Sequence, residues 1–89
     1  AKEYAGYGIT CNEICPGPIV SDMMNEIGRR AIAQGGGTLA IYLKEVCDAI
    51  PAKRRVRPLE LAALAVFLAS PAAGYLTGAS IPMDGGMIA

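Results

Sequence analysis

The sequence predicts an α/β fold, because two short strand-like segments stand on either side of a helix that can cross between them. Residues Ile9 to Cys15 are rich in β-branched and small side chains and are followed by Pro16-Gly17, which is typical of a strand that ends at a breaker. Residues Ala79 to Met83 form a second short strand. A helical crossover between two strands favours parallel pairing.

The crossover helix is predicted over Leu59 to Ser70. Pro58 stands where helices begin, and Glu60 lies in the first turn, where a negative charge suits the helix dipole. The helix is apolar almost all round, so we expect it to be buried on more than one side. Residues 1–8 are predicted as the end of a preceding helix.

Two further helices are predicted between the first strand and the crossover helix. Met23 to Ala33 is weakly helical, with Ser21 or Asp22 as its N-cap. Gly35-Gly36-Gly37 interrupt the pattern, and a second helix follows over Leu39 to Ala49. The basic run that comes next, from Lys53 to Arg57, is predicted as a solvated loop.

Composition excludes several function classes. The chain has 89 residues, eight basic and eight acidic side chains, and a formal net charge of zero, which argues against nucleic-acid or membrane partners. It has no His, so it cannot build a Ser-His-Asp or Cys-His site alone, and a zinc site would depend on Cys and carboxylates. At 53% hydrophobic residues the chain is too apolar for disorder.

The three cysteines are Cys11, Cys15 and Cys47, an odd number that does not suggest a disulfide framework. Cys11 and Cys15 would lie about 13 Å apart along a strand, too far for a bridge. Free thiols in a reducing cytoplasm are therefore predicted. The longest aliphatic run, Leu61 to Ala69, is too short to span a bilayer.

Several short motifs follow one another in a fixed order. They are Tyr7 to Asn12 leading into Cys15 to Ser21, Arg54-x-x-x-Pro58, Glu60-Leu61-Ala62 at a helix start, and Tyr75 to Gly78 leading to Met83 to Gly86. Together they closely resemble the C-terminal part of the short-chain dehydrogenase/reductase family, in particular the branch of polyol, 3-hydroxybutyrate and 3-oxoacyl reductases. The resemblance covers essentially the whole chain.

The resemblance implies a Rossmann-like, doubly wound parallel sheet, of which residues 1–89 form the C-terminal portion of a single domain. Ile9 to Cys15 and Ala79 to Met83 would be its last two strands. The implied activity is an NAD- or NADP-dependent oxidoreductase that transfers hydride between the nicotinamide and a small carbonyl or secondary alcohol substrate. Residues 16–50 would form the cofactor and substrate loop with its lid.

The same resemblance assigns roles to individual residues. Pro16 and Gly17 would lie against the nicotinamide ring, where Gly permits close approach. Ile19 would offer its backbone N–H and C=O to the carboxamide, and Ser21 stands where the family usually has Thr. The substrate lid would begin with Pro18, Met23 and Met24.

The catalytic residues of the family are not in this sequence. Its Gly-rich cofactor loop, its catalytic Ser and its Tyr-x-x-x-Lys pair are all absent, and Tyr4 and Tyr7 have Gly8 and Cys11 in place of that Lys. The resemblance therefore implies that the catalytic set lies upstream of Ala1 and that no catalytic residue falls within these residues.

Simpler interpretations remain for most of these residues. Pro16-Gly17 could be an ordinary turn, Ser21 and Asp22 caps or surface groups, and Met23 and Met24 helix packing. Asp84 is predicted as a turn residue. Glu13 is expected to face a polar cavity or a neighbouring Arg, because a buried carboxylate needs a partner.

Three functions therefore compete. The first is the enzyme portion, which would also form a homo-oligomer, a tetramer or a dimer, through the 58–70 helix and the 79–83 strand. The second is a non-catalytic, truncated relative that acts as an oligomerisation or binding module. The weakest is a thiol-based redox or metal protein, because C-x-x-x-C is not a redox or zinc spacing.

Overall fold

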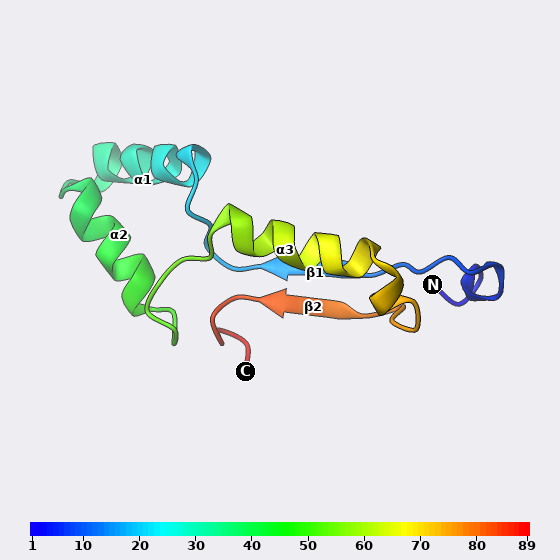
Figure 1. The fold of residues 1–89 in the computed structure, drawn as a ribbon. Helices are drawn as coiled ribbons and strands as arrows, with labels where there is room; N and C mark the ends of the chain where they lie inside the picture. Colours follow the sequence, from blue (N-terminus) through cyan, green and yellow to red (C-terminus); the bar gives the residue numbers. More distant parts are fainter.

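The computed structural model describes residues 1–89, which form three helices, two strands and two short 3-10 turns. In chain order they are the 3-10 turn η1 (Ala5–Tyr7), β1 (Glu13–Pro16), α1 (Asp22–Gly35), α2 (Leu39–Asp48), α3 (Pro58–Ala69), the 3-10 turn η2 (Pro71–Ala73) and β2 (Ser80–Met83). Figure 1 shows β1, β2 and α3 running side by side, while α1 and α2 stand at one end of this group.

The two strands pair in parallel, which confirms the predicted α/β class. Glu13 lies opposite Ser80 and Pro16 opposite Met83. β1 begins four residues later than predicted, because residues 9–12 have no ladder partner in β2. The Asn12 side chain holds this approach from both sides: its amide donates to the Leu76 carbonyl at 2.9 Å, and the Ala79 N–H donates to Asn12 Oδ1 at 3.1 Å. A backbone bond from the Gly78 N–H to the Cys11 carbonyl, at 2.8 Å, lies beside it.

The two faces of this small sheet differ. Ile14 and Ile81 are half-buried, whereas the neighbouring Glu13 and Ser80, which point to the other face, are exposed. The crossover helix α3 runs along the sheet and half-buries Leu61, Leu64 and Leu68, which are spaced to lie on one side of a helix (Figure 1). The burial pattern thus indicates that α3 covers the face that carries the two isoleucines.

The predicted burial of α3 on more than one side is not met within these residues. Leu59 is 80% exposed and Val66 70% exposed, on the side of the helix that faces away from the sheet. α3 therefore has a covered apolar stripe and an uncovered one.

The helices α1 and α2 form a pair that is packed through a glycine. Gly28 of α1 is buried, and a Cβ at this position would lie 2.8 Å from the ring of Tyr42 on α2. Side-chain caps begin both helices, since Ser21 Oγ accepts from the Met24 N–H at 3.2 Å and Thr38 Oγ1 from the Ile41 N–H at 3.3 Å. Of the two predicted caps, Ser21 is thus the one that forms.

The chain has almost no core of its own. It measures 54 × 22 × 21 Å, and only Gly28, Ile50 and Ala73 are buried. Most of the apolar excess seen in the composition therefore lies on the surface. None of the helices combines the length and the apolar character that a membrane crossing requires.

Candidate functional site

An apolar groove of about 490 Å³ opens at the carboxyl ends of the two parallel strands, a size typical of small-molecule sites. Both strands end at the same edge of the sheet, so the loop after β1 and the chain after β2 meet there (Figure 1). Ligands of parallel α/β sheets bind outside this edge. The lining residues are Pro16, Gly17, Pro18, Ile19, Met23, Met24, Asp84, Met87 and Ile88.

Six of the seven residues predicted for the cofactor and lid line this groove. The seventh, Ser21, caps α1 and is not among the lining residues. Its oxygen accepts the bond from the Met24 N–H, so its own O–H remains able to donate to a second group. The two functions considered for Ser21, cap and ligand contact, are therefore chemically compatible.

Gly17, at the end of β1, lies against the backbone at the end of β2. A Cβ at Gly17 would lie 2.9 Å from the Cα of Asp84, and the Gly17 N–H donates to the Met83 carbonyl at 3.1 Å. Backbone atoms cannot turn away as the end of a side chain can. The absence of a side chain at Gly17 thus allows the two strand ends to meet. This requirement for a glycine was not predicted from the sequence.

Three lining residues were not assigned to the site from the sequence: Asp84, Met87 and Ile88. Asp84 was predicted as a turn residue, and this is confirmed, because its Oδ1 accepts from the Gly86 N–H at 3.0 Å. Met87 and Ile88 belong to no motif. The only signal for them was that they follow the strand that pairs with β1.

The two methionines that were predicted to begin the lid differ in exposure. Met23 is 70% exposed, so helix packing does not account for it, whereas Met24 is half-buried. Both border the groove at the first turn of α1. Flexible thioether side chains suit an apolar wall that must fit ligands of varied shape.

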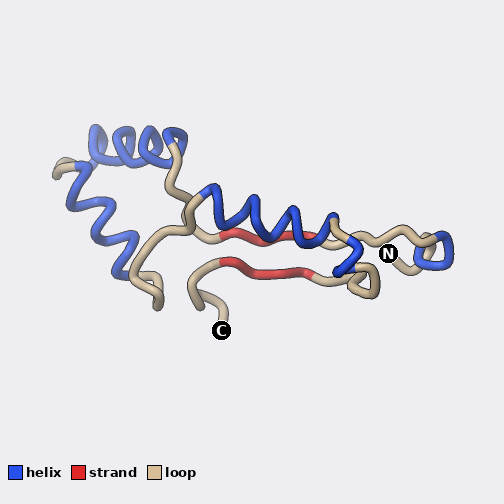
Figure 2. The backbone as a smooth tube through the Cα atoms, in the orientation of Figure 1, coloured by secondary structure: helices blue, strands red, loops and turns tan.

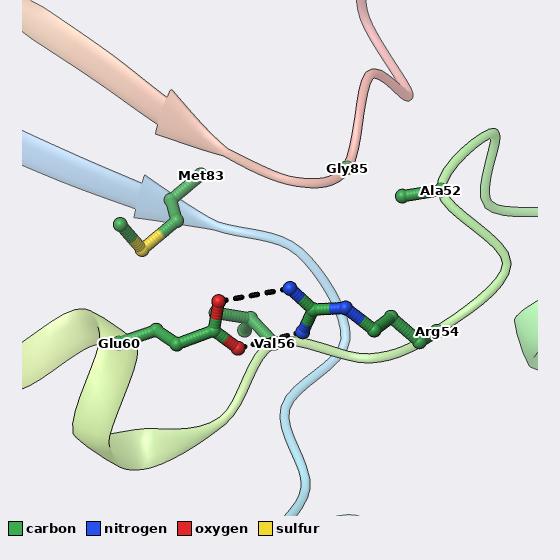
Figure 3. A pocket seen from close by; sticks show the side chains of 6 residues that line it. All are labelled: Ala52, Arg54, Val56, Glu60, Met83 and Gly85. Carbon is green, nitrogen blue, oxygen red and sulfur yellow. Dashed lines mark hydrogen bonds and ion pairs between the residues drawn. The ribbon is translucent and has the colours of Figure 1, made fainter.

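A second, much smaller pocket of about 100 Å³ contains an ion pair (Figure 3). Arg54 Nη1 and Nη2 donate to Glu60 Oε1 and Oε2 at 2.6 and 2.9 Å, and the Arg57 N–H donates to Glu60 Oε1 at 3.1 Å. The hydrogen bond from Arg54, together with that from Arg57, lowers the pKa of Glu60 to about 2. The Arg54–Glu60 ion pair fixes the start of α3. Because the two charges neutralise each other, this pocket presents little free charge to a ligand.

The basic run is a loop in which Lys53, Arg54 and Arg57 are exposed, as predicted, but two of its guanidinium groups have partners within the chain. Arg54 is held by Glu60, and Arg55 is half-buried, with its guanidinium bonded to Asn25 and to the Ile19 carbonyl. The sequence pattern missed this, because the partners lie six residues ahead in one case and 30 or more behind in the other.

Of the two surroundings predicted for Glu13, the structure shows the cavity: Glu13 lines an open pocket of about 290 Å³ together with polar residues that include Asn12 and Ser80, and no Arg is bonded to it. Its Oε1 accepts from Ser80 Oγ at 2.6 Å and from Cys15 Sγ at 3.5 Å, and these bonds, the Ser80 one foremost, lower the pKa of the carboxyl. Partial desolvation and the Glu13 carboxylate raise the pKa of the Cys15 thiol. A raised thiol pKa disfavours the thiolate, which weakens the redox interpretation.

All three cysteines are free. No group of three or more His, Cys, Asp or Glu side chains is arranged to hold a metal ion.

The geometry defines a class of protein: a parallel α/β fold with an apolar groove at the carboxyl ends of the strands. Comparisons with known proteins narrow it. A sequence model of the family described as enoyl-(acyl carrier protein) reductase matches residues 1–88. Oxidoreductase UcpA from Escherichia coli is 42% identical over 86 residues, which are 97% of this chain and 32% of UcpA.

Solved structures agree. A short chain dehydrogenase family protein from Francisella tularensis is 31% identical and superposes with a TM-score of 0.94 over 98% of this chain and 36% of its own. L-sorbose reductase from Gluconobacter frateurii, solved with NADPH and L-sorbose, is 35% identical with a TM-score of 0.88, over 98% of this chain and 34% of its own. The chain belongs to the short-chain dehydrogenase/reductase family, and it spans about a third of the length of these relatives.

Proposed function

We propose that residues 1–89 act as the C-terminal part of an NAD- or NADP-dependent oxidoreductase that transfers hydride between the nicotinamide and a carbonyl or secondary alcohol. The observation that carries the proposal is the groove, in which a loop after one parallel strand and the chain after the other form an apolar wall. Support comes from L-sorbose reductase, a relative whose structure holds NADPH and a sugar substrate.

The residues of the groove fit a nicotinamide. The ring is flat and its carboxamide is uncharged, so it suits a wall of Pro16, Gly17 and apolar side chains that excludes water. The cofactor supplies the hydride. In this proposal Ile19 orients the carboxamide through its backbone, Ser21 donates its hydroxyl hydrogen, and Pro18, Met23 and Met24 begin the lid over the substrate.

Proton transfer to the substrate is assigned to groups outside these residues. The four tyrosines, Tyr4, Tyr7, Tyr42 and Tyr75, are followed four positions later by Gly8, Cys11, Val46 and Ala79, so none belongs to a Tyr-x-x-x-Lys pair. We therefore place the catalytic Ser, Tyr and Lys in a preceding part of the protein.

The uncovered stripe of α3 supports a homo-oligomer, in which Leu59 and Val66 would contact a second subunit together with β2. Exposed apolar patches of this kind are typical of subunit interfaces. The three free thiols support a reducing cytoplasm.

The test is to extend the reading frame that encodes these residues upstream, express the resulting protein and titrate it with NADH and NADPH. We expect a Tyr-x-x-x-Lys motif just before Ala1, binding of one coenzyme, and reduction of carbonyl compounds followed by coenzyme absorbance. Residues 1–89 alone should show no turnover. A stable assembly that binds neither coenzyme, seen by size-exclusion chromatography and titration, would instead establish the non-catalytic module.

A further inference from the structure

The helix pair α1–α2 is joined to the rest of the molecule by a neck of two chain segments, residues 17–21 and 49–57 (Figure 2, tan). The two segments lie side by side through an isolated parallel bridge between Ile19 and Val56. The Val20 N–H donates to the Val56 carbonyl at 2.9 Å, and the Val56 N–H donates to the Pro18 carbonyl at 3.0 Å. The neck therefore sets where the helix pair stands relative to the groove.

Arg55 ties this neck together from its second segment. Its Nη1 donates to Asn25 Oδ1 at 3.1 Å and to the Ile19 carbonyl at 3.4 Å. One guanidinium thus connects the loop that lines the groove with the first turns of α1. Both Arg55 and Asn25 are half-buried, so water competes less for these bonds than it does at a fully exposed pair.

The bond to Ile19 reaches the backbone group that the proposed function assigns to the carboxamide. A carbonyl oxygen has two lone pairs, so Arg55 can hold the Ile19 peptide plane while one lone pair stays available. A loop held in its binding geometry before the ligand arrives loses less conformational entropy on binding.

We propose that Arg55 is a positioning residue, which holds the Ile19 carbonyl and the start of α1 in the arrangement that binds the nicotinamide end of the coenzyme. The inference rests on the proposed function. The role assigned to Arg55 concerns only the nicotinamide end of the coenzyme. The loss of this role can therefore be distinguished from a general effect on folding.

The experiment compares the upstream-extended protein with its Arg55→Met variant in titrations with the preferred coenzyme and with adenosine diphosphate ribose, which lacks the nicotinamide. For a coenzyme with a 2′-phosphate, the 2′-phosphorylated form of that probe is used. We expect Arg55→Met to weaken coenzyme binding about tenfold and to leave binding of the probe unchanged. Arg30→Met, which removes an exposed charge from α1, is the matched control and should change neither value.

A substitution at Asn25 is a second, milder variant, which tests the role of Arg55 even if the Arg55→Met protein does not fold. Asn25→Ala removes one acceptor and leaves the Ile19 contact, so we expect about a threefold loss of coenzyme affinity. Asn25→Asp keeps an acceptor for Arg55 and should retain the affinity.

The outcomes separate the two proposals. An unmodified protein that binds neither NADH nor NADPH overturns the proposed function and this inference with it. Coenzyme binding that is unchanged in Arg55→Met, or lowered equally by Arg30→Met, overturns the role of Arg55 alone. The same holds for equal losses of coenzyme and probe, because a merely structural residue would affect both ends.

Discussion

The unit of β1, α3 and β2 and the helix pair α1–α2 are held together by different kinds of contact. In the first, segments that are far apart in the chain meet: Glu13 pairs with Ser80 across 67 residues. In the second, two consecutive helices pack through Gly28 and Tyr42. The first unit therefore depends on long-range closure of the chain, and the second can form locally.

The two units also differ in what borders the groove. The strand unit provides backbone, at the Pro16-Gly17 turn and the bend at Asp84, together with the side chains of Met87 and Ile88 that follow β2. The helix pair provides flexible side chains, Met23 and Met24. The closely packed backbone at the strand ends is thus combined with flexible apolar side chains from both units, an arrangement that suits a mostly apolar ligand.

The largest effect is expected at the point where the two strand ends meet. In Gly17→Ala the new Cβ would lie 2.9 Å from the Cα of Asp84, and no side chain can move aside. We expect a loss of about 2 kcal/mol in the free energy of unfolding, measured by urea titration. Gly6→Ala, where no atom lies within 4 Å of the added Cβ, should be close to neutral. Equal effects of the two variants would show that the strand ends are not tightly joined.

A smaller effect is expected within the helix pair. In Gly28→Ala the Cβ would lie 2.8 Å from the Tyr42 ring, but alanine gains about 1 kcal/mol of helix propensity over glycine. The net loss should be about 1 kcal/mol, together with a change in the near-ultraviolet circular dichroism of tyrosine. Gly35→Ala, with open space around its Cβ, should stabilise α1. A Gly28→Ala protein as stable as the Gly35→Ala protein would contradict tight packing of α1 on α2.

The smallest effect is expected at the ion pair that precedes α3, and it depends on pH. The pKa of Glu60 falls from its ordinary 4.5 to about 2 in the folded chain, so its contribution to stability is fully present above pH 4.5 and is lost as the pH falls towards 2. Glu60→Gln should be less stable than the unmodified protein at neutral pH, and this difference should disappear over that range.

Thermal unfolding at a series of pH values measures this difference. Glu45→Gln, on α2 and outside the ion pair, is the control and should follow the pH dependence of the unmodified protein. A constant difference between Glu60→Gln and the unmodified protein from pH 2 to 7 would rule out the role of the charge.

The sequence predicted the parts of this structure that depend on local chemistry. Pro58 and Glu60 mark the start of α3, Ser21 caps α1, and Pro16-Gly17 ends β1, because each acts on neighbouring backbone groups. The predictions that failed concern partners distant in the chain. The start of β1 depends on where β2 begins, and the bond from Arg55 to Ile19 spans 36 residues, which no local pattern encodes.

The same reason explains the incomplete prediction of the groove. The loop side was predicted from a motif, whereas Met87 and Ile88 reach the groove only because their strand pairs in parallel with β1.

The helix pair lies inside the long connection between the two paired strands, and this has a consequence for how such a protein can diversify. The entropy of closing a flexible connection grows only with the logarithm of its length, so doubling the length costs about 0.6 kcal/mol. Helices inserted or removed between Ile19 and Val56, the bridged residues of the neck, would leave the strand register unchanged. The helix pair can therefore change in length and sequence at small thermodynamic cost while the paired strand ends stay in place.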